Sequence, residues 1–93
     1  MITAIVLVDT EADRIPEAAQ AISQVPGVSE VYSVAGDVDL IAVVRVRKHD
    51  DLADVIADRV SKVAGVVRTQ TFIAFRTYSK HDLEAAFSIG LED

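Results

Sequence analysis

The chain has 93 residues, which is the length of one domain, and a formal net charge of -6. Its 51% of hydrophobic residues excludes a disordered chain, and its acidic balance argues against direct binding to nucleic acid. The absence of cysteine excludes disulfides, thiolate metal sites and a cysteine nucleophile, and fits a reducing, cytoplasmic location. We expect neither a signal peptide nor a membrane span, because no apolar run is long enough.

Hydrophobic periodicity alternates between strand and helix along the chain. Turn residues punctuate the pattern, with Pro26 and Gly27 after the first helix and Gly65 after the second. The predicted elements are a strand at 1–8, a helix within 9–25, strands at 28–35 and 38–46, a helix within 48–65, a strand at 66–78 and a short helix within 79–93. The expected N-caps are Thr10 or Asp13 for the first helix and Asp50 or Asp51 for the second.

The order of these elements contains an internal repeat. Each of the two main helices ends in a Val-x-Gly-Val sequence, at 25–28 and 63–66, and a strand follows each time. Two interleaved βαβ halves predict an α+β, ferredoxin-like βαββαβ fold with a short C-terminal helix. Right-handed crossovers place both main helices on one face of a four-stranded antiparallel sheet.

The other face of the predicted sheet is unusually apolar. Strands exposed on one side should alternate apolar and polar residues, but Ile5 and Leu7 in the first strand and Ile41 and Val43 in the third break that rule. At about 25 cal/mol per Å² of apolar surface, leaving them in water costs several kcal/mol. We therefore expect a second copy of the sheet to cover this face in a homodimer.

Catalytic and metal-binding motifs are weak. His49 and His81 lie before predicted helices, where a solvated histidine is the ordinary interpretation, and their spacing matches no zinc motif. The sequence contains no glycine-rich phosphate loop and no nucleophile elbow. We expect no cofactor and no metal. A dimeric ferredoxin-like enzyme, of the small monooxygenase or isomerase type, stays an alternative, although the chain lacks the Asn and Trp that such cavities often use.

Two acids flank the predicted hairpin turn in the sequence GDVDL. Asp37 beside Gly36 is ordinary turn chemistry, but Asp39 falls on the apolar face, where a carboxylate needs a hydrogen-bond donor or a cation. Thr69 and Thr71 share one side of the last strand. The threonines fit either β-propensity or contact with a small zwitterion, and the acids fit either turn structure or an amine site.

Together, "PGV" after the first helix, "GDVDL" at the hairpin and "VAGVVRTQTFIAF" in the last strand resemble the RAM (regulation of amino acid metabolism) domain of the Lrp/AsnC transcription regulators. The resemblance covers residues 2–78. Full-length members carry a helix-turn-helix ahead of this domain, whereas this chain begins with the first strand. We therefore expect residues 1–93 to be a single, stand-alone RAM domain.

The resemblance implies a dimeric α/β barrel formed by paired sheets, assembly into a larger, octamer-like ring, and amino-acid effectors bound between dimers near the hairpin loop. Gly36 would allow close approach of the effector, and the acids would contact its amino group. Val38 stands where an aromatic residue often occurs in the family, which leaves the pocket shape and the effector open. The implied effector-binding residues are Tyr32, Ser33, Gly36, Asp37, Asp39, Thr69 and Thr71.

The expected function is therefore a non-enzymatic, amino-acid-binding regulatory module. Mixed assembly with full-length Lrp/AsnC regulators is a further expected role. An assembly protein without any ligand is the other alternative beside the enzyme. The role of residues 79–93 is open, either as an oligomer contact or as a cap on the sheet edge.

Overall fold

The computed structural model describes residues 1–79 and alternates strands with helices in the predicted order. The helix predicted within 79–93 lies, apart from its first residue, outside the described residues. The elements are β1 (Ile2–Thr10), the 3-10 helix η1 (Ala12–Arg14), α1 (Ile15–Ser23), β2 (Val28–Ser33), β3 (Leu40–Val46), α2 (His49–Ile56), the 3-10 helix η2 (Val60–Lys62) and β4 (Val66–Ile73).

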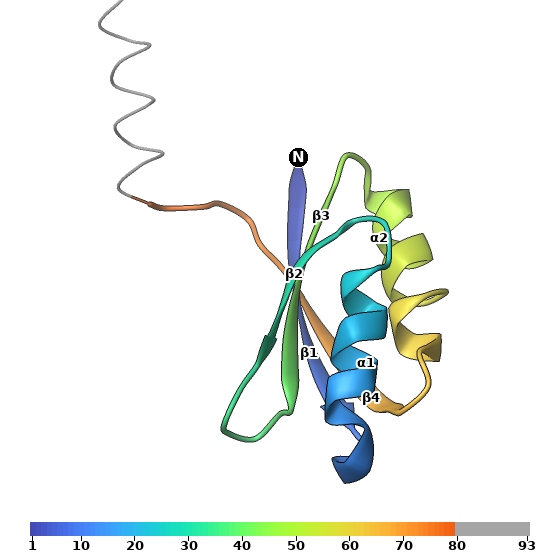
Figure 1. Ribbon diagram of the computed structural model, residues 1–93. Coiled ribbons are helices and arrows are strands. Elements are labelled where there is room, and N and C mark those ends of the chain that lie inside the picture. The colour runs from blue at the N-terminus through green and yellow to red at the C-terminus, as the bar shows by residue number, and fades with distance from the viewer. Residues whose placement is uncertain (80–93) are drawn as a thin grey trace, which may run out of the picture.

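The four strands form one antiparallel sheet in the order β2-β3-β1-β4, and α1 and α2 cover one of its faces (Figure 1). In β1, one of the two central strands, Val6 pairs with Ala42 of β3 on one side and with Thr71 of β4 on the other. This arrangement confirms the ferredoxin-like α+β fold and the placement of both helices on the same face.

The core lies between the sheet and the two helices. Alternate residues of the central strands point towards the helices and are inaccessible to solvent, such as Val6 and Leu40, and Ile22 of α1 packs against them. Fully burying a side chain of this size contributes about 1.5–3 kcal/mol. The buried hydrophobic residues are Ala4, Val6, Val8, Ala18, Ile22, Leu40, Ala42, Val44, Val46, Leu52, Val55 and Val60.

Several element ends differ from the prediction, among them the end of β1, which reaches Thr10 rather than residue 8. Residues 34–39 form a longer bend than the predicted turn, and the backbone N–H of Asp39 donates to the Val8 carbonyl of β1. β4 ends at Ile73, opposite Ala4 of β1, rather than at residue 78, although the Ala74 N–H still donates to the Thr3 carbonyl. α2 stops at Ile56, and η2 then turns Val60 into the core.

The predicted helix caps are wrong. The N-cap positions of α1 and α2 are Arg14 and Lys48, and neither makes a side-chain capping hydrogen bond. Thr10 belongs to β1 and Asp13 to η1, which leads the chain into α1, while Asp50 and Asp51 lie in the first turn of α2. None of the helices described is long and apolar enough to cross a bilayer.

Candidate functional site

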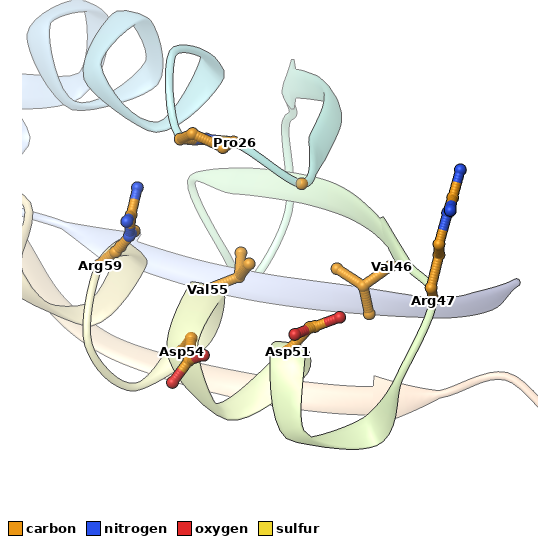
Figure 2. A pocket seen from close by; sticks show the side chains of 8 residues that line it. Pro26, Val46, Arg47, Asp51, Asp54, Val55 and Arg59 are labelled. Atoms are coloured by element: carbon orange, nitrogen blue, oxygen red, sulfur yellow. The ribbon is translucent and has the colours of Figure 1, made fainter.

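Two surface hollows of residues 1–79 contain none of the predicted effector-binding residues. One is lined by Phe75, Arg76 and Tyr78, after the end of β4. The other lies between α2 and the loop that joins α1 to β2 (Figure 2). No cluster of three or more His, Asp or Glu side chains suited to a metal ion occurs in this part of the chain.

The predicted residues centre instead on the bend of residues 34–39 between β2 and β3. The Val34 N–H donates to the Asp39 carbonyl at 3.1 Å, which closes the bend, and the Asp39 N–H donates to the Val8 carbonyl at 3.1 Å, which ties it to β1. Gly36 has a φ of 146°, in the region that favours glycine, and a Cβ added there would meet nothing within 4 Å. The bend is therefore anchored at its base and open at its tip.

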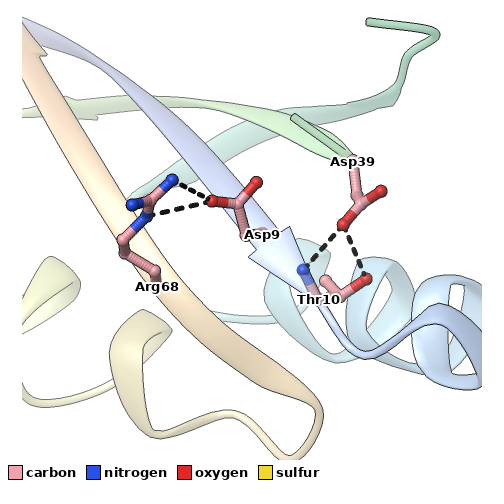
Figure 3. A network of polar contacts seen from close by, with 4 residues as sticks. All are labelled: Asp9, Thr10, Asp39 and Arg68. Atoms are coloured by element: carbon pink, nitrogen blue, oxygen red, sulfur yellow. Dashed lines mark hydrogen bonds and ion pairs between the residues drawn. The ribbon is translucent and has the colours of Figure 1, made fainter. Parts of the chain in front are cut away.

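Asp39 is held by the end of β1 (Figure 3). Its Oδ2 accepts a hydrogen bond from the Thr10 backbone N–H at 2.9 Å and a longer one from the Thr10 hydroxyl at 3.4 Å. The half-buried carboxylate thus has the donors that its position requires. Its second oxygen, Oδ1, makes no hydrogen bond within the described residues.

Asp37 differs from Asp39 in its exposure and in its hydrogen bonding. Its side chain is exposed, and it makes no hydrogen bond or ion pair with any residue between 1 and 79. The structure thus separates the two acids of the GDVDL sequence, one with a clear structural role and one whose charge is met by no other described group.

Tyr32 and Ser33 lie at the end of β2 that leads into the bend. Tyr32 is 49% exposed and sits opposite Ile41, on the sheet face away from the helices. A hydrogen bond to the Glu30 carboxylate raises the pKa of Tyr32, helped by desolvation and by the Glu30 charge, while Arg45 acts in the opposite direction. Ser33 sits opposite buried Leu40.

Thr69 and Thr71 share one side of β4, as predicted, but that side is the helix face. They pair with Val8 and Val6, and the Thr69 hydroxyl lies 3.4 Å from the hydroxyl of Ser61. β4 and β2 form opposite edges of the sheet, about 14 Å apart at the usual strand spacing. Within one chain, the two threonines and Tyr32 therefore do not line a common pocket.

The sheet face away from the helices is uncovered in the described chain, and we call it the open face. Its apolar centre includes large side chains that are 39–50% exposed. The ion pairs Arg45–Glu30, at 3.6 Å, and Arg68–Asp9, at 2.9 Å, lie on the same face by strand register. The apolar residues of the open face are Ile5, Leu7, Tyr32, Ile41, Val43 and Phe72.

Sequence reasoning placed four of these residues on the open face but not Tyr32 and Phe72. Assigning Tyr32 and Phe72 to this face requires the strand register, which pairs Phe72 with Ile5 and Tyr32 with Ile41. Period-two alternation fixes faces within a strand, but only the pairing shows that two aromatic rings join the same patch.

This fold occurs in known proteins. The family model for the Lrp/AsnC ligand binding domain matches residues 3–83, so the chain belongs to that family. An uncharacterized HTH-type transcriptional regulator of Pyrococcus horikoshii, PH1916, is 36% identical over 61 residues, which are 66% of this chain and 41% of the regulator. The chain thus spans less than half of that relative's length.

Two solved structures extend the likeness. TTHA0845 from Thermus thermophilus superposes with a TM-score of 0.81 at 42% identity, over 86% of this chain and 100% of that chain. The feast or famine regulatory protein Rv3291c from M. tuberculosis, solved in complex with L-methionine, superposes with a TM-score of 0.71 at 27% identity, over 86% of this chain and 54% of that chain. The family of this chain is thus one of transcriptional regulators, and one structural neighbour binds an amino acid.

Proposed function

We propose that the chain is a non-enzymatic regulatory module that self-associates through the open face and binds a small amino acid at the 34–39 bend. Its curated relatives are transcriptional regulators, and a neighbour of the same fold was solved with methionine. The observation that carries the ligand-binding part is Asp37, an exposed carboxylate in an anchored bend. It makes no hydrogen bond or ion pair with another described residue.

The chemistry of the bend suits the amino group of an effector. An ammonium group has one positive charge and three donors, and the Asp37 carboxylate and the free Oδ1 of Asp39 supply acceptors. Gly36 leaves room for close approach of a ligand to the backbone, since nothing lies within 4 Å of the position its Cβ would take.

Self-association follows from the open face. Ile5, Tyr32 and Phe72 are 39%, 49% and 50% exposed and lie beside further half-buried aliphatic side chains. An apolar patch of this kind marks an interaction surface, and a two-fold axis lets one patch cover its own copy. Further assembly of such dimers into a ring is part of the proposal.

A site shared between two copies of the chain would bring together the seven predicted effector-binding residues, which do not meet within one chain. Thr69 and Thr71 lie on the opposite edge and the opposite face of the sheet from Tyr32, so one amino acid cannot reach them all within one chain. In an assembly, β4 of one copy approaches the bend of another. Effector that binds only the assembled form then stabilises it by mass action.

Isothermal titration of the chain with each of the twenty amino acids tests the ligand. We expect saturable heat with at least one of them, and an affinity about tenfold weaker in Asp37→Asn, because one charge-assisted hydrogen bond is lost. Asp58→Asn removes an equally exposed carboxylate elsewhere and should leave the affinity unchanged. If no amino acid gives heat, the chain is instead an assembly protein without this ligand.

Mixed assembly with regulators is tested separately. We expect the tagged chain to co-purify with a full-length Lrp/AsnC regulator expressed in the same cell. Ile5→Glu, which places a charge on the open face, should abolish the co-purification, whereas Ala21→Glu, on exposed α1 surface, should not. Equal recovery with both variants would exclude association through the open face.

A further inference from the structure

The hollow beside α2 lies at the end of β3 that is remote from the 34–39 bend. β3 leaves the bend at Leu40 and reaches the hollow at Val46, six residues or about 20 Å along the strand. The hollow has a volume of about 280 Å³, close to the lower end of the range for small-molecule sites. Its lining residues are Pro26, Gly27, Val46, Arg47, Asp51, Asp54, Val55 and Arg59.

The floor of the hollow is apolar and fixed. Val46 and Val55 are each only 7% exposed and belong to the core. Gly27 lies against them so closely that an added Cβ would be 2.9 Å from Val55 Cγ2 and 3.3 Å from Val46 Cγ1. The Arg45 N–H holds the same loop by donating to the Gly27 carbonyl at 2.9 Å. A preformed apolar floor is typical of small-molecule sites.

The rim of the hollow carries charges of both signs. Arg47 and Arg59 project from its two ends, and the Asp51 carboxylate lies between them on the side of Val46 (Figure 2). None of these three side chains makes a hydrogen bond or ion pair with another residue in the described part of the chain, where the ion pairs are those of Arg45 and Arg68. A ligand here meets two cations, the half-buried Asp51 carboxylate and the exposed carboxylate of Asp54, which also lines the hollow.

We propose that this hollow is a second ligand site, which takes a small zwitterion of the α-amino-acid class with a short aliphatic side chain. Asp51 accepts from the ammonium group, and Arg47 or Arg59 donates two parallel N–H bonds to the carboxylate. The aliphatic side chain lies on Val46 and Val55. The site is independent of the 34–39 bend and of self-association, because one chain supplies all of it.

Amide chemical shifts of the ¹⁵N-labelled full chain, titrated with L-valine, test the proposal. We expect saturable shifts at Gly27, Arg47 and Val55, since their amides surround the hollow. Isovalerate, which is L-valine without the ammonium group, and isobutylamine, which is L-valine without the carboxylate, should each bind about tenfold more weakly or worse, because each loses a charge-assisted contact.

Single substitutions on the rim separate recognition from folding. Asp51→Asn and Arg59→Gln should each weaken L-valine binding about tenfold, and the circular dichroism spectrum should show that both variants stay folded. Asp58→Asn and Lys62→Gln remove exposed charges of the same sign outside the hollow and should bind like the unaltered chain.

The results that would overturn the second site differ from those that test the bend. Absence of saturable shifts at Gly27 and Val55 with L-valine excludes the second site, whether or not residues 34–39 respond. Equal binding of isovalerate and L-valine excludes recognition of a zwitterion. Shifts confined to residues 34–39 would contradict the second site while supporting the bend.

Discussion

Asp39 accepts a hydrogen bond from the backbone N–H of Thr10 at 2.9 Å and so joins the start of β3 to the end of β1 (Figure 3). Thr10 is only 9% exposed, so its N–H has little access to water. The contact bridges 29 positions in the sequence and fixes the base of the 34–39 bend. One acid of the GDVDL sequence thus supports the bend, and the other, Asp37, stays free at its tip.

Asp39→Ala should lower the free energy of unfolding by about 1–3 kcal/mol, because a nearly buried N–H loses its acceptor. Asp37→Ala should change it by less than about 0.5 kcal/mol, since its side chain is exposed and unpartnered. Urea unfolding followed by circular dichroism measures both variants. Equal destabilisation by the two substitutions would contradict the division of roles between the acids.

Gly27→Ala should destabilise the chain more than Gly36→Ala. Gly27 combines a φ of 99° with a Cβ position 2.9 Å from Val55, so backbone strain and overpacking add to about 2–4 kcal/mol. Gly36 has open space around it and incurs the backbone cost alone, about 1–2 kcal/mol. Thermal melts of both variants test this order of stability. A larger loss of stability in Gly36→Ala than in Gly27→Ala would contradict it.

The raised pKa of Tyr32 predicts how its phenol ionises. Because the neutral phenol donates a hydrogen bond to the Glu30 carboxylate, and desolvation and the Glu30 charge both disfavour a phenolate, the fold stabilises the neutral phenol. That stabilisation is fully present below the unfolded value of about 10 and is lost as pH rises through the higher pKa of the folded chain. NMR titration of the Tyr32 ring should show a lower pKa in Glu30→Gln and no change in the matched Glu11→Gln variant. An unchanged Tyr32 pKa in Glu30→Gln would contradict this interpretation.

The sequence was sufficient for features that depend on periodicity. Alternation in β1 placed Val6 towards the helices and Ile5 away from them, and the structure buries the first completely while leaving the second 39% exposed. The repeated Val-x-Gly-Val ends of the helices likewise predicted where β2 and β4 begin, since a glycine stop and an apolar run are local signals.

Features that depend on distant contacts could not be predicted in the same way. Thr10 was expected to cap a helix, but it ends β1 and binds Asp39 instead. β4 was expected to reach residue 78 but ends at Ile73, opposite Ala4 of β1. For the candidate site, sequence reasoning identified the bend but could not show that β2 and β4 occupy opposite edges of the sheet.

Substitution on the open face should separate association from folding. Ile5→Glu places a charge opposite Val43 and Phe72, where a covering copy would bury it, so we expect a folded monomer. Ala21→Glu, exposed on α1, should leave the mass unchanged. Light scattering after size exclusion gives the masses, and Phe72→Glu provides an independent variant should Ile5→Glu not fold.

Cover of the open face by a second copy is the central claim, and sedimentation velocity at micromolar concentration tests it most directly. The account predicts a dimer or larger species, of at least twice the 10.0 kDa mass of one chain. A single, well-folded 10.0 kDa species under these conditions would contradict it, because the apolar open face would then be stable in water.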